Sequence, residues 1–373
     1  MQLPGMTPLF WTRATVLLAS SALACSESAI PFDHATITLS VDSVTVTDIL
    51  DTGPGDSVRF LSVVGATRLS NGVVVVADAF DHSVRFLARD KTLLRTVGRR
   101  GSGPGEFKTI GWLGQCGKDT VYVWDVDVAR VVVLDTAGAV LQHIPALFSP
   151  ALVACSQTRT FVTALTPQNM PRPSAADPPT YLSRLLFTRA LTDTLGYLED
   201  IPLGDPRPLR PLTRVAVARD RVYVGRSDSA LVQQYNFRGN ETGIYRLGLP
   251  SRRPTAANVT AAIDQMVEMF PDQAFRSQSK AYLRALPPPE ILPFYSDLFV
   301  SPDDMLWVVT SAPGDDATQF RVLSPDGRIE ADVTLPINIH VRDVGADYIL
   351  GTYNDEGGHV HLLVVVKPEL GVN

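Results

Sequence analysis

The chain has 373 residues, of which 45% are hydrophobic and only 19% are charged. This composition supplies enough apolar material for a core and excludes a disordered chain. The formal net charge of −6 gives no electrostatic basis for a nucleic-acid partner, because binding phosphates requires a basic surface.

The first 24 residues predict a signal peptide for export. Arg13 is their only charged residue, and an apolar run follows it at 14–19, too short to span a bilayer. Residues 22–24 (Ala-Leu-Ala) fit a signal-peptidase site, whereas Leu-Ala-Cys at 23–25 resembles a lipoprotein signal. The match is imperfect, since Ala22 stands where the usual signal has Leu. We expect a periplasmic or cell-surface protein that contacts the membrane only through a lipid on Cys25, if that lipid is attached.

Self-similar segments predict the fold of residues 25–373. In residues 71–98 and again in 121–141, a β-branched strand ends in Asp and a second strand begins five residues later; the two aspartates, Asp78 and Asp125, are 47 residues apart. Weaker copies follow at 160–187, 222–235, 306–327 and 348–366. This period predicts a single all-β domain, a six-bladed β-propeller. The strand-like segment 35–47 is expected to join the last blade as its outer strand and close the ring.

Two of these segments resemble a known group of propellers. Val76-Ala77-Asp78 followed by the run Gly98–Phe107 looks like the strand and linker signature of NHL-repeat propellers. Leu306-Trp307-Val308 and Ser324–Gly327 resemble related exported bacterial six-bladed propellers. The resemblance covers residues 35–370. It implies the fold far more than a function, since members of that bacterial group mostly lack an assigned activity.

Two insertions indicate which face of the propeller binds a ligand. Residues 165–180 are rich in proline and interrupt the third blade between its second and third strands. Residues 251–290, between the fourth and fifth blades, carry apolar residues at helical spacing and predict a small helical insertion. In a meander counted outward from the axis, both insertions fall on the same face. Because chains elaborate the face that carries function, we expect the ligand there.

The distribution of charged residues indicates the same face as the place where a ligand binds. The connections between blades are rich in arginine and lysine and lead into the innermost strands, whereas acidic residues such as Asp78, Asp125 and Asp315 lie on loops further out. We hypothesise a basic channel mouth within an acidic collar; the alternative is that these charges pair at a solvated surface. The candidate ligand-binding residues are Arg100, Lys108, Arg214, Asp297, His340 and Arg342.

Two cysteines remain after Cys25. Cys116 and Cys155 each lie six residues before the aromatic residue of an equivalent strand, so they occupy matching places in neighbouring blades. An oxidising compartment would allow a disulfide between them. The alternative is two separate buried thiols.

No motif indicates a catalytic centre, a cofactor or a metal. The glycines at 98–105 lack the ending of a phosphate-binding P-loop, and no nucleophile-elbow motif is present. The favoured function is a cell-envelope binding or scaffolding propeller that recognises a small anion, a glycan or a peptide at its channel mouth. The alternative is a metal-dependent propeller hydrolase or lyase of the lactonase type. That alternative requires several inward-pointing ligands, and only Asp297, His340 and Asp343 fit, so whether the protein is an enzyme stays open.

Overall fold

A computed structural model describes residues 35–38, 47–48, 60–90, 92–145, 150–155, 161–165, 181–188, 193–200, 206–268, 273–336, 338–354 and 360–368. The predicted signal peptide, Cys25 and residues 166–180 of the proline-rich insertion lie outside them. Within the described ranges, neither helix is long and apolar enough to cross a membrane.

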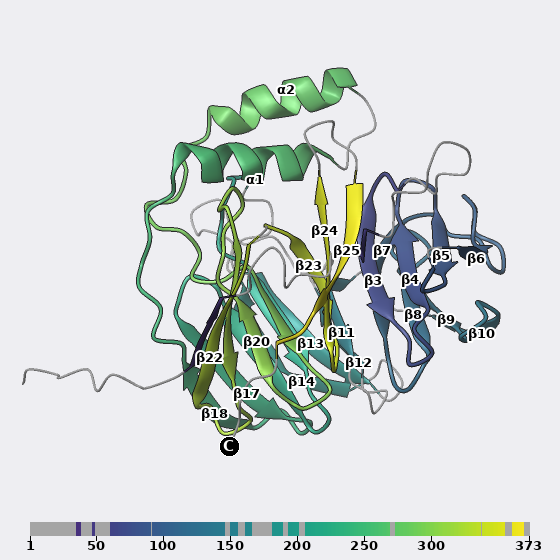
Figure 1. Cartoon of the computed structure of the whole chain (residues 1–373), viewed down its shortest axis with the longest axis horizontal. Helices are drawn as coiled ribbons and strands as arrows, with labels where there is room; N and C mark the ends of the chain where they lie inside the picture. The colour runs from purple at the N-terminus through teal and green to yellow at the C-terminus, as the bar shows by residue number, and fades with distance from the viewer. Residues whose placement is uncertain are drawn as a thin grey trace, which may run out of the picture. The chain divides into compact units, whose positions relative to one another are not determined.

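The described strands form small sheets arranged as a β-propeller (Figure 1), and the prediction of this fold is confirmed. The first two sheets are β3 (Val63–Arg68), β4 (Val74–Asp78), β5 (Ser83–Leu87) and β6 (Leu93–Val97), then β7 (Ile110–Gln115), β8 (Val121–Asp125), β9 (Arg130–Leu134) and β10 (Val140–Pro145). The next two are β11 (Pro150–Cys155), β12 (Phe161–Leu165), β13 (Tyr181–Thr188) and β14 (Asp193–Asp200), then β15 (Thr213–Val217), β16 (Arg221–Arg226), β17 (Leu231–Asn236) and β18 (Glu241–Arg246). The last two are β19 (Asp297–Val300), β20 (Leu306–Val309), β21 (Thr318–Leu323) and β22 (Ile329–Leu335), then β23 (His340–Val344), β24 (Tyr348–Asn354) and β25 (Val360–Val366).

The innermost strands surround a central channel. They contact one another in the order β3, β7, β11, β15, β19 and β23, and β23 returns to β3. The core lies between neighbouring sheets: Phe86 and Val121 of the next sheet belong to one buried cluster, and Trp307 and Ile349 belong to another. Each such buried side chain contributes roughly 1.5–3 kcal/mol, so the packing that fixes the sheets also fixes the channel wall.

The N-terminal strands cover two sheet edges. β1 (Ala35–Thr38) pairs in parallel with β22, and β2 (Thr47–Asp48) pairs antiparallel with β25. The expectation that segment 35–47 joins the last sheet is therefore right for Thr47, which pairs with β25. It is wrong for Ala35–Thr38, which pair with β22 of the preceding sheet. A strand at the edge of a sheet leaves backbone N–H and C=O groups unpaired. The strands β1 and β2 supply partners for these groups on β22 and on β25.

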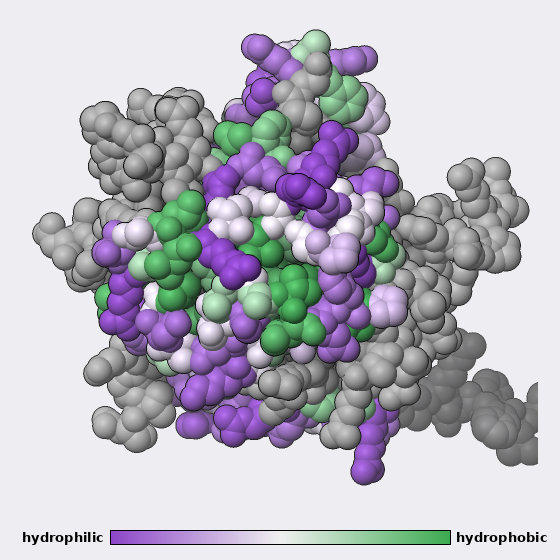
Figure 2. Space-filling model, turned by 90° about the vertical axis from the view of Figure 1, so that its right-hand side faces the viewer, coloured by the Kyte–Doolittle hydropathy of each residue, from purple (hydrophilic) through white to green (hydrophobic). Residues whose placement is uncertain are grey.

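The outer strands of the first two sheets expose apolar side chains. Leu94 of β6 is 56% exposed and Leu141 of β10 is 61% exposed. Figure 2 shows apolar side chains among polar ones on this side of the molecule. The residues before them, Leu93 and Val140, are exposed as well, so each of these two outer strands displays a pair of apolar side chains.

The insertion between β18 and β19 forms the two predicted helices, α1 (Ala256–Glu268) and α2 (Gln273–Arg284). Thr255 caps α1: its Oγ1 accepts a hydrogen bond from the Asn258 N–H (3.1 Å), and Asn258 Oδ1 accepts one from the Thr255 N–H (2.9 Å), a reciprocal arrangement that satisfies two free donors. Ile263 packs against Leu283 of α2, whereas Ala262 packs against the propeller. Helix α1 therefore buries apolar residues on two sides.

Candidate functional site

Three consecutive cavities occupy the channel within the described residues. The waist cavity, of about 350 Å³, is lined by residues of all the innermost strands. The mouth cavity, of about 410 Å³, lies between these strands and helix α1 and shares Arg214 and Asp297 with the waist. The far cavity, of about 420 Å³, lies at the other end and shares Thr67 and Asp343 with the waist. The channel is therefore hollow along the axis.

Arg214 and Asp297 form a loose ion pair where the waist meets the mouth. Arg214 lies on β15, and its Nε donates a 2.5 Å hydrogen bond to the Ser296 carbonyl oxygen. Its Nε is 3.8 Å from Asp297 Oδ1, an oxygen that also accepts the Leu298 N–H. The Asp297 side chain is 45% exposed to the channel, yet the surrounding walls raise its pKa, against the lowering effect of Arg214. Neither charge is fully neutralised by the other.

His340 and Arg342 lie two residues apart on β23, the strand that starts at the mouth. His340 lines the mouth cavity and Arg342 lines the waist. The enclosing walls, with Arg342 as a second cause, lower the pKa of His340 to about 4, although the residue as a whole is exposed. His340 is therefore neutral at pH 7, and Arg342 carries the positive charge of this strand.

Four of the six predicted site residues are thus brought together: Arg214, Asp297, His340 and Arg342. Arg100 and Lys108 are exposed and line none of the three cavities. Their loop folds back on itself, because the Phe107 N–H donates to the Arg99 carbonyl oxygen (2.9 Å) and the Phe107 ring is fully buried. The expectation that these two cations gather at the axis is therefore corrected.

The acidic collar is also corrected. Asp78 and Asp125 are fully buried rather than displayed on outer loops. Asp78 accepts the Leu61 N–H (2.8 Å), and Asp125 accepts the Lys108 and Thr109 N–H groups. Each carboxylate fixes the chain that leads into an innermost strand.

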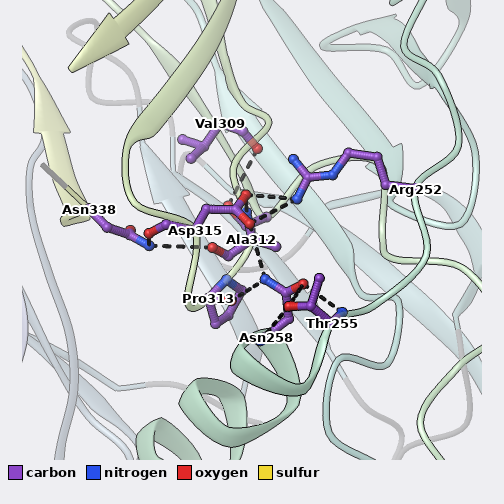
Figure 3. A network of polar contacts seen from close by, with 9 residues as sticks. Arg252, Thr255, Asn258, Val309, Ala312, Pro313, Asp315 and Asn338 are labelled. Carbon is purple, nitrogen blue, oxygen red and sulfur yellow. Dashed lines mark hydrogen bonds and ion pairs between the residues drawn. The ribbon is translucent and has the colours of Figure 1, made fainter. Parts of the chain in front are cut away.

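Asp315, the third acid of that expectation, holds helix α1 against the propeller (Figure 3). Its carboxylate accepts hydrogen bonds from Arg252 (2.7 and 3.0 Å), from the Asn258 side chain (3.0 Å) and from the Ala312 N–H (2.8 Å). The neighbouring Gly314 has a φ of +77°, and a Cβ there would lie 2.6 Å from the Ala257 carbonyl oxygen. The wall that α1 gives to the mouth cavity is therefore fixed in place.

The cavities are also lined by residues other than the six candidate ligand-binding residues. Arg207 and Arg210 line the mouth just before β15, and Met266 of α1 lines it from above. Asp343, between the waist and the far cavity, accepts hydrogen bonds from the Tyr348 hydroxyl (2.5 Å) and from Thr67 Oγ1 (2.7 Å), and burial raises its pKa. For Arg207 and Arg210, the sequence signal was their position just before an innermost strand. Nothing in the sequence predicts the hydrogen bond from Thr67 to Asp343, because the two residues are 276 positions apart.

A disulfide joins Cys116, directly after β7, to Cys155 at the end of β11, with a Cα–Cα distance of 5.4 Å. It links the innermost strands of neighbouring sheets, and Cys155 lines both the waist and the far cavity. Among the described residues, no three His, Cys, Asp or Glu side chains lie close enough together to hold a metal ion.

Comparison with known proteins shows the fold. No protein-family profile matches the chain, and no curated protein sequence is similar to it. A predicted exported protein from Bacteroides fragilis is 12% identical, with a TM-score of 0.53 over 89% of this chain and 99% of that one. A gluconolactonase from Xanthomonas campestris (12% identical, TM-score 0.45, 89% and 95% covered) and virginiamycin B lyase from Staphylococcus aureus (10% identical, TM-score 0.42, 86% and 98% covered) are more distant. At these identities the likeness extends to the β-propeller architecture alone.

Proposed function

We propose that the protein is an exported ligand-binding propeller and that a small anionic ligand binds in the mouth cavity. One observation carries this proposal: Arg207, Arg210 and Arg214 line that cavity against the single carboxylate of Asp297, in a chain whose net charge is −6. His340 adds no charge at pH 7. A cluster of like charges in an enclosed site attracts the opposite charge more strongly than it would in open solvent.

The arginines differ in how much of their hydrogen-bonding capacity the protein already uses. Arg214 donates through Nε to a backbone carbonyl, and Arg210 makes no hydrogen bond or ion pair within the described part of the chain. A guanidinium binds carboxylate and phosphate oxygens in pairs, so Arg210 and the unused end of Arg214 supply donors for a ligand. The cavity volume of about 410 Å³ suits a small molecule.

The remaining parts of the proposal concern architecture and location. We interpret the sheets as a closed six-bladed ring of the NHL-like kind, exported through the signal at 1–24, with Cys25 as the site of a lipid anchor. Glycans and peptides with a carboxylate satisfy the same chemistry as a free organic anion. The metal-dependent hydrolase or lyase is the alternative, and a stoichiometric divalent ion in the purified protein would favour it.

Anion titration tests the proposal. Acetate and sulfate are titrated into the mature chain and into the Arg210→Gln variant, with binding followed by NMR chemical shifts. We expect the substitution to weaken binding about ten- to a hundredfold, because a hydrogen bond to a charged group contributes about 1.5–3 kcal/mol. Arg100→Gln is the matched control: it removes the same charge from an exposed residue outside the cavities. Equal affinities in all three proteins, or no binding of either anion, would refute the proposal.

A further inference from the structure

The mouth cavity is lined by apolar residues as well as by arginines. Leu209, Ala262, Met266 and Ile339 line it, and they come from three segments: the chain before β15, helix α1 and the chain before β23. Leu209, Ala262 and Ile339 are buried, and Met266 is half-buried. These three segments together therefore give the mouth cavity an apolar wall.

Three of the neutral polar side chains that line the mouth cavity have hydrogen-bond partners within the described residues. The Asn338 side-chain amide donates to the Asp315 carbonyl oxygen (2.6 Å), and the Tyr295 hydroxyl donates to that of Leu231 (3.1 Å). Ser227 Oγ accepts the Leu212 N–H (2.8 Å). Gln265 of α1 also lines the cavity. Away from this amide, a polar group placed against the apolar residues would lose its water and gain little in return, so these residues favour an apolar group.

We infer that the ligand of the mouth cavity is an amphipathic organic carboxylate. Its carboxylate binds at Arg210 and Arg214, and its apolar body packs against Ala262 and Met266 under helix α1. This inference rests on the proposed function and names its ligand class. Because Asp315 fixes α1, the apolar wall is formed before the ligand arrives, and binding requires little ordering of the protein.

A chain-length series tests the inference. Acetate, butyrate, hexanoate and octanoate are titrated at pH 7 by calorimetry, or by NMR where binding is weak. Burial of each added methylene contributes about 0.8 kcal/mol, so we expect an increase in affinity of up to about fourfold per methylene until the cavity is filled. Met266→Gln should weaken octanoate binding about tenfold and leave acetate binding unchanged.

The control variant is Tyr282→Gln, which makes an apolar-to-polar change on α2 at a side chain that is 56% exposed; it should leave the whole series unchanged. Acetate binding that needs Arg210, with no gain from longer chains, would overturn the inference and leave the proposed function standing. The inference would also be wrong if octanoate binding gained from chain length but was unaffected by Met266→Gln, since the apolar body would then bind elsewhere. Failure of every carboxylate to bind would overturn both.

Discussion

Arg252 Nη2 lies 3.0 and 2.7 Å from the two carboxylate oxygens of Asp315, and this pair joins the chain before α1 to the loop after β20. Asp315 also accepts the Asn258 side-chain N–H and the Ala312 N–H. One partly buried carboxylate thus helps to fix the position of the helical insertion. It acts together with the packing of Ala262 against the propeller and the hydrogen bond from the Asn258 side chain to the Pro313 carbonyl oxygen (2.7 Å).

We predict that Asp315→Asn lowers the free energy of unfolding by about 1–3 kcal/mol, because it removes the charge from several hydrogen bonds at once. Chemical denaturation measures this change, and hydrogen exchange should show faster exchange of the α1 amides in particular. Asp264→Asn is the control, since Asp264 pairs with Lys280 in a largely exposed ion pair between the helices and should contribute less than about 1 kcal/mol. Equal effects of the two substitutions would contradict the role given to Asp315.

A second prediction concerns the buried carboxylate of Asp125. It accepts the Lys108 and Thr109 N–H groups and lies 3.5 Å from Arg130 Nη2. In Asp125→Asn the new amide donor would face these donors, so we expect a loss of about 2–3 kcal/mol in chemical denaturation. Asp127→Asn, at an exposed residue two positions along, should cost less than about 1 kcal/mol. A neutral effect of Asp125→Asn would show that the blade connection does not depend on this carboxylate.

The sequence predicts the fold well because its signals are local. The strands that end at Asp78 and Asp125 repeat with one period, and the apolar spacing of α1 lies within a single segment. The same repeats misled us about charge. Asp78 and Asp125 are acidic residues at the end of a strand, and nothing in the sequence distinguishes a carboxylate that binds backbone N–H groups from one on the surface.

The site is only partly predictable for the same reason. Arg214 and Arg342 lie within the innermost strands β15 and β23, and their positions follow from the meander. Arg100 lies in the connection that leads to the innermost strand β7, but this loop folds back through Phe107 and leaves Arg100 at the surface. The Thr67–Asp343 hydrogen bond joins the first sheet to the last, a contact that exists only once the ring of inner strands has formed.

A third prediction concerns the Cys116–Cys155 disulfide, which closes a loop with a sequence separation of 39 residues. Constraint of the unfolded chain over such a loop stabilises the fold by roughly 3–4 kcal/mol in the chain-entropy description. We expect the Cys116→Ser/Cys155→Ser double variant to unfold at a lower denaturant concentration than the oxidised protein. Reductant should shift the oxidised protein toward the variant and leave the variant itself unchanged. Coincident unfolding curves for the oxidised protein and the double variant would contradict a stabilising role.

The last prediction concerns the pH dependence of His340. In the folded protein the channel walls and Arg342 lower its pKa from 6.5 to about 4, so the unfolded chain takes up the proton first as the pH falls. The stability that depends on neutral His340 is therefore complete above about pH 6.5 and is lost progressively toward pH 4. Because the residue as a whole is exposed, we expect a measured pKa between these two values. An NMR titration, with the His340 signal assigned by its loss in His340→Gln, gives this value directly. Arg342→Gln removes the neighbouring cation and should raise the pKa of His340. A midpoint at or above 6.5 in the unsubstituted protein would mean that His340 faces open solvent and that Arg342 does not act on it, and the mouth would then gain a positive charge near neutral pH.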